Sequence, residues 1–172
     1  LAEVEPLSAD YRSFPALDGW EFDLLRAAMS VEVIQSFTLI HDDIMDEDDL
    51  RRGVPAVHIE YDEEAAILAG DTLYSKAFEM LSDTGARPEH EVEAVHRLAS
   101  TCTRICEGQS LDVAYENRTD VSPEEYLEMV RLKTAVLFGA SAAIPASLMG
   151  ADQAVIEGVY QYGTDVGRAF QI

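Results

Sequence analysis

The chain has 172 residues, of which 48% are hydrophobic, enough for a folded domain with a sizeable core. Its formal net charge of −21 excludes nucleic acid or an anionic membrane as a general surface partner, because phosphate binding needs clustered Lys and Arg. No apolar run approaches the roughly 18 residues of a membrane span, and no signal peptide is visible, so we expect a cytoplasmic protein with no transmembrane segment.

The acidic residues are spread along the chain, and only two lysines occur against ten arginines. Distributed acid with scarce lysine is typical of halophilic proteins, whose surfaces repel themselves at low salt. We therefore expect a halophilic protein, and the alternative is an ordinary acidic enzyme.

Apolar residues recur with a helical period through nearly the whole chain, and alternating strand patterns are absent. A loop is expected at 51–61 because it contains Gly and Pro. Ser122, followed by Pro and then Glu, has the pattern of a capping box, and Pro145 either kinks its segment or opens the next turn. The predicted helices cover 21–46, 63–81, 91–115, 122–139, 140–149 and 152–172. We predict an all-α bundle, a single domain over 1–172, whose site residues project inward from facing helices.

An acidic run begins where the first long helix ends. Asp42 and Asp46 would share one helix face, about 6 Å apart along the axis. Two such carboxylates repel each other unless a cation lies between them. Mg²⁺ takes oxygen ligands, commonly one or two carboxylates together with substrate phosphates. We predict Asp42 and Asp46 as ligands of Mg²⁺; Asp43 either binds the ion too or only orients the site.

The two arginines that follow, Arg51 and Arg52, suit phosphate oxygens, so the whole run predicts a diphosphate–metal site. An EF-hand is excluded because Ile44 and Leu50 occupy ligand positions. The His41–Asp42 pair also suggests an HD-domain phosphohydrolase, but such a site needs another histidine upstream, and none precedes His41.

The sequence DDxxD at 42–46, followed by DLRRG at 49–53, resembles the first aspartate-rich motif of the trans-isoprenyl diphosphate synthases, the polyprenyl synthetase family. Terpene cyclases share DDxxD alone, but further similarities follow in the family's order. These are AGD at 69–71, GQSLD at 108–112, KT at 133–134 and FQI at 170–172. The resemblance covers about 31–172 and is closest to a haloarchaeal geranylgeranyl diphosphate synthase.

The resemblance implies an orthogonal helix bundle of the isoprenoid synthase type, with a central apolar cavity. It also implies a Mg²⁺-dependent homodimer that acts on isopentenyl diphosphate and allylic diphosphates. Arg51 and Lys133 would bind the allylic diphosphate, and Arg52 the isopentenyl diphosphate. A bulky residue at the position of Phe37 would form a floor for the growing prenyl tail. The other substrate-binding residues that the resemblance implies are Gln35, Gln109, Asp112, Thr134 and Gln171.

Two family elements have no match: a basic GGKRxRP element before residue 31, and a second DDxxD after Ile172. Composition also changes abruptly at 14–19. We expect the chain to lack a segment near 14–19 and everything beyond Ile172; the alternative is a member that has lost both elements. Other functions left open are a farnesyl diphosphate synthase, a class I terpene cyclase and a non-catalytic subunit of a heteromeric synthase.

Overall fold

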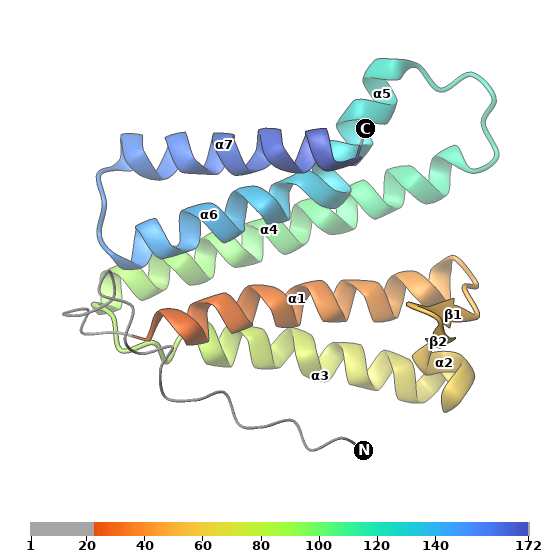
Figure 1. Cartoon of the computed structure of the whole chain (residues 1–172), viewed down its shortest axis with the longest axis horizontal. Helices are drawn as coiled ribbons and strands as arrows, with labels where there is room; N and C mark the ends of the chain where they lie inside the picture. The colour runs from red at the N-terminus through yellow and green to blue at the C-terminus, as the bar shows by residue number, and fades with distance from the viewer. Residues whose placement is uncertain (1–22, 172) are drawn as a thin grey trace.

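The helices of this chain lie side by side in layers (Figure 1). The computed structural model describes residues 23–171, so the composition change at 14–19 and Ile172 lie outside the described residues. Helices α1 and α3 form an antiparallel pair, and α4, α6 and α7 pack together beside it. The elements are α1 (Leu24–Met45), β1 (Leu50–Arg51), β2 (Val54–Pro55), α2 (Val57–Glu60), α3 (Glu63–Leu81), α4 (Pro88–Tyr115), α5 (Pro123–Val130), η2 (Arg131–Ala135), α6 (Val136–Leu148) and α7 (Gln153–Gln171).

Helix starts follow local capping chemistry. The side chain of Asp23 accepts hydrogen bonds from the first backbone N–H groups of α1. The capping box predicted at Ser122 is present, since Ser122 and Glu125 each accept from the other's backbone N–H. Helix α4 begins earlier than predicted, because Pro88 fits the first turn, where no N–H partner is needed.

The predicted break after Gly139 is wrong, because helix α6 runs from Val136 to Leu148 without a break there. Gly139 serves packing instead: an added Cβ would lie 2.4 Å from Oγ1 of Thr164 on α7. Pro145 does not end the helix either, which continues to Leu148. Burial of this segment therefore outweighs the helix-breaking tendency of the two residues.

The stretch predicted as a loop at 51–61 contains a small hairpin and the short helix α2. In the hairpin Leu50 pairs with Pro55 and Arg51 with Val54, which leaves two residues in the turn. These are Arg52 (φ 54°) and Gly53 (φ 82°). Two positive φ values in a two-residue connection are the geometry of a type I′ turn.

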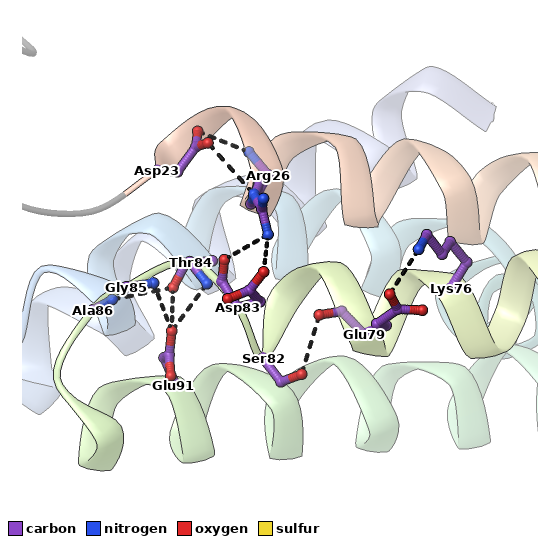
Figure 2. A network of polar contacts seen from close by, with 10 residues as sticks. All are labelled: Asp23, Arg26, Lys76, Glu79, Ser82, Asp83, Thr84, Gly85, Ala86 and Glu91. Atoms are coloured by element: carbon purple, nitrogen blue, oxygen red, sulfur yellow. Dashed lines mark hydrogen bonds and ion pairs between the residues drawn. The ribbon is translucent and has the colours of Figure 1, made fainter.

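The largest buried cluster joins α1, α3, α4 and α6. Its fully buried side chains include Ile34, Leu81, Leu98, Ile144 and Leu148. A network of polar contacts surrounds the loop between α3 and α4, next to the start of α1 (Figure 2). There one carboxylate oxygen of Glu91 accepts from the N–H and Oγ1 of Thr84 and from the N–H of Gly85. Within 23–171, no helix is long and apolar enough to cross a membrane.

Candidate active site

Lys133 joins three elements at one point. Its Nζ lies 2.6 Å from Oδ2 of Asp112 on α4 and 3.2 Å from Oδ1 of Asp42 on α1. Burial acts to lower the pKa of Lys133, but the hydrogen bond to Asp112 and the charge of Asp42 outweigh it and raise that pKa. The ammonium is therefore held in its charged form. We name Lys133, Asp42, Asp46 and Asp112 the lysine–aspartate cluster.

The backbone at Lys133 forms a π-helical turn, η2, between α5 and α6. Such turns often occur at functional sites. Gly108 of α4 lies directly against this turn: an added Cβ would be 2.2 Å from the backbone N of Lys133 and 2.6 Å from its Cα. The missing side chain at Gly108 thus lets η2 approach α4 closely enough for Lys133 to reach Asp112.

Asp42 and Asp46 stand at the end of α1, where Asp42 closes the helix by accepting the N–H of Asp46. Burial, and then the charge of Asp42, raise the pKa of Asp46, while Lys133 lowers it. The pair therefore carries repulsion that one ammonium does not remove, and a divalent cation would relieve it. Among residues 23–171, no three acidic, His or Cys side chains group closely enough to hold a metal by themselves. This donor set fits an ion that also takes water or phosphate oxygens.

Arg51 and Asp43 are bound to each other. Asp43 is 2% exposed, and Oδ1 accepts hydrogen bonds from Nε (2.8 Å) and Nη2 of Arg51. Nη2 of Arg51 also lies 3.7 Å from Oδ2 of Asp48. The hydrogen bonding of Arg51 to Asp43 is the main reason why the pKa of Arg51 is raised, and the charges of Asp43, Asp48 and Asp42 also raise it. Asp43 thus orients Arg51 next to the acids, and its role as a metal ligand stays a prediction.

Arg52 occupies a strained position in the hairpin turn. It is exposed and has a positive φ of 54°, a conformation that costs a non-glycine residue about 1–2 kcal/mol. Strained residues concentrate at ligand sites. The contact of Arg52 with a substrate phosphate stays a prediction.

Phe37 lies five residues before Asp42, about 1.4 helical turns, and forms part of an aromatic row. Its ring is 4.9 Å from that of His41 and 5.1 Å from that of Tyr74 on α3. His41 is half-buried, and its Nε2 lies 3.2 Å from the carbonyl oxygen of Ile67 on α3. An added Cβ at Gly70 would meet the His41 ring at 2.2 Å. The AGD element therefore serves to seat His41 between α1 and α3.

For the remaining predicted substrate-binding residues, the structure gives burial but no contact that indicates their role. Gln35 and Thr134 are half-buried, and Gln171 is exposed at the end of α7. Gln109 is 9% exposed, and its Nε2 has no hydrogen-bond partner within 23–171. A buried donor of this kind costs stability unless something accepts from it.

The structure is an all-α bundle in which Lys133 faces carboxylates from α1 and α4. Residues 13–172 match the polyprenyl synthetase family model, so the chain belongs to that family. The expected resemblance is thereby confirmed, and so is the isoprenoid synthase type of fold.

Relatives support this assignment. The chain is 70% identical to a geranylfarnesyl diphosphate synthase of the haloarchaeon Natronomonas pharaonis over 172 residues, 100% of this chain and 50% of that protein. The geranylgeranyl pyrophosphate synthetase structure from Geoglobus acetivorans matches with a TM-score of 0.84 and 53% identity, covering 85% of this chain and 48% of that one. A polyprenyl synthase of Caulobacter crescentus, solved with calcium and isoprenyl diphosphate, matches with a TM-score of 0.79 and 36% identity, over 85% and 43% of the two chains. The chain thus spans about half the length of the relatives it matches.

The sequence motifs identified the members of the lysine–aspartate cluster, but they did not indicate which backbone features position these side chains. The π-helical turn has no distinct sequence signal. Gly108 was visible only as part of GQSLD, and its close approach to the backbone of Lys133 is seen only in the structure. The pairing of Asp43 with Arg51 was missed because their contact depends on the hairpin.

Proposed function

We propose that the protein containing this chain is a Mg²⁺-dependent prenyltransferase, which condenses isopentenyl diphosphate head-to-tail with an allylic diphosphate. The lysine–aspartate cluster carries the proposal, because it gathers three carboxylates and an ammonium beside Arg51. Carboxylates suit a divalent cation, and Lys and Arg suit the diphosphate oxygens. The Caulobacter relative, which was solved with calcium and isoprenyl diphosphate, supports the same pairing of ligands.

Asp42 and Asp46 would hold the cation, with Asp43 as a further candidate. When bound there, a divalent cation supplies charge neutralisation of the leaving diphosphate, worth several kcal/mol. Lys133 and Arg51 bind the allylic diphosphate and stabilise the charge that develops on it.

Arg52 and Gln35 bind the isopentenyl diphosphate. As the allylic C–O bond breaks, the double bond of the isopentenyl group attacks the allylic carbon, and a proton leaves to the released diphosphate. Thr134, Gln109 and Gln171 line the reacting region. Apolar side chains between the helices exclude water from the cation.

The product we propose is geranylgeranyl diphosphate, with 20 carbons. Phe37 lies about 7.5 Å along the helix from Asp42, in the direction in which a prenyl tail would run. Its ring is supported by His41 and Tyr74, so it cannot easily move aside. The name of the Natronomonas relative favours 25 carbons as the second candidate, and that of the Geoglobus relative agrees with 20. Farnesyl diphosphate, with 15 carbons, is the third. We also propose a homodimer, as expected for the family.

The test is product formation by the full-length protein from isopentenyl diphosphate and each allylic diphosphate, with Mg²⁺ and with EDTA. We expect turnover only with the cation, and loss of turnover in Asp42→Ala with Asp46→Ala. Asp49→Ala is the matched control, since its side chain is an exposed acid of the same run.

Turnover in the presence of EDTA, or by the double variant, would show that Asp42 and Asp46 do not bind a metal ion needed for the reaction. No product under any condition would favour the non-catalytic subunit. Cyclic hydrocarbon formed from an allylic diphosphate alone would identify a terpene cyclase.

A further inference from the structure

Lys133 is placed to act as an internal counterion of the predicted metal ligands. Its Nζ is shared between Asp112 at 2.6 Å and Asp42 at 3.2 Å, so one ammonium links α4 to α1. Both carboxylates and the lysine side chain are largely shielded, with side-chain exposures of 35%, 19% and 22%. The chain has only one other lysine, Lys76, which is exposed and pairs with Glu79.

The ammonium of Lys133 does not neutralise the negative charge of the lysine–aspartate cluster. Three carboxylates act on it, from Asp42, Asp46 and Asp112, and a single positive charge faces them. A divalent cation would neutralise more charge. However, a cation bound to Asp42 and an ammonium paired with the same carboxylate repel each other, since both are positive and close together.

We propose, on the basis of the prenyl transfer proposed above, that Lys133 holds Asp42 in the metal-free protein and is displaced from it by the divalent cation. The displaced ammonium keeps its contact with Asp112 and directs its remaining N–H donors to the substrate diphosphate. Metal binding thereby switches Lys133 from a partner of the protein's own carboxylate to a partner of the substrate.

The contacts of Lys133 indicate that its ammonium would stay beside Asp112 after leaving Asp42, and would not move out into solvent. The Asp112 contact is the shorter of the two, and Asp112 is not a predicted metal ligand. The lysine backbone is fixed by η2 against Gly108, so the movement is confined to the flexible four-carbon stem. An ammonium has three donors, and one bond to Asp112 leaves two for phosphate oxygens.

Calorimetric titration of Mg²⁺ into the full-length protein without substrate tests the exchange. Lys133→Met removes the competing charge and keeps the side-chain length, so we expect the Kd for Mg²⁺ to fall by about tenfold or more. Lys133→Arg keeps the charge and should bind Mg²⁺ within about threefold of wild type. Lys76→Met is the matched control for loss of one lysine charge and should leave the Kd unchanged.

The gain must also depend on Asp42. In an Asp42→Asn background, Lys133→Met should give no tightening, because the contact that competes with the metal is already gone. An unchanged or weaker Kd in Lys133→Met would overturn the exchange, and so would equal tightening in the Asp42→Asn background. A circular dichroism melt of each variant confirms that the compared proteins are folded.

Turnover distinguishes this exchange from the proposed function. If wild type makes prenyl product but Lys133→Met binds Mg²⁺ no more tightly, the exchange is wrong and the function stands. If Lys133→Met tightens Mg²⁺ binding but wild type makes no product, the exchange stands and the function is wrong. With both correct, Lys133→Met binds metal more tightly and has a higher KM for the allylic diphosphate.

Discussion

Replacing Gly108 by alanine should separate η2 from α4. The added Cβ would lie 2.2 Å from the backbone N of Lys133 and 2.7 Å from the carbonyl carbon of Leu132. Backbone atoms cannot turn aside as a flexible side chain can, so one helix must move. Overpacking of this kind costs about 1–3 kcal/mol, and contact with backbone puts it near the upper end. Alanine recovers about 1 kcal/mol of helix propensity. We expect a net loss of about 2 kcal/mol in the free energy of unfolding.

Gly158 provides the matched control, because it also lies within a helix and an added Cβ would meet nothing within 4 Å among the described residues. Gly158→Ala should stabilise by about 1 kcal/mol. Thermal melts of the two variants should therefore move in opposite directions, by about 2–4 °C per kcal/mol for a domain of 150–250 residues.

Because Lys133 moves with η2, Gly108→Ala should also lower kcat/KM for the allylic diphosphate, while Gly158→Ala should not. If Gly108→Ala matches wild type in both stability and kcat/KM, then the close approach of η2 to α4 does not position Lys133.

Four other changes test separate features. The raised pKa of Asp46, caused first by burial, means that its ionised form costs stability at pH values above that pKa, and the cost disappears as pH falls through the window toward 3.8. In EDTA at pH 7, Asp46→Asn should therefore be more stable than wild type in a thermal melt, but by less than about 1 kcal/mol, because Asp46 is largely exposed and only partly desolvated. Excess Mg²⁺ should make wild type the more stable of the two, and a lower melting temperature for Asp46→Asn in EDTA would contradict the charge argument. Glu91→Ala should cost about 2–3 kcal/mol in denaturant unfolding, since three donors of Thr84 and Gly85 lose their acceptor, while Glu91→Gln, which keeps a carbonyl oxygen, should cost less; equal losses would argue against these hydrogen bonds. Phe37→Ala should give prenyl products with longer chains, measured by chromatography after dephosphorylation. If an active variant gives the same chain lengths as wild type, Phe37 does not form the floor for the prenyl tail. Finally, the melting temperature should rise with KCl from 0.1 to 2 M, because the Debye length falls from about 10 Å at 0.1 M to about 3 Å at 1 M; a flat or falling curve would contradict the halophilic interpretation.

Local sequence determined most of the helices and the chemistry at the end of α1. The capping box joins Ser122 to Glu125, only three positions later, so it could be predicted, and it is present. Asp42 and Asp46 lie at the end of helix α1, and their spacing of four residues alone places them on one face. Such features depend on residues within one or two turns, which is why they can be predicted without the fold.

The tertiary structure decided where helices continue and what the charged residues bind. Gly139 and Pro145 are poor helix residues, but the segment runs on because its burial against neighbouring helices is worth more than local propensity. The hairpin turn brings Arg51 back to Asp43, and Gly108 lets η2 approach α4 so that Lys133 reaches Asp112 and Asp42. These contacts join residues far apart in the chain, and their energies depend on burial and distance. Burial and distance are set only when the helices pack, so neither can be read from the sequence.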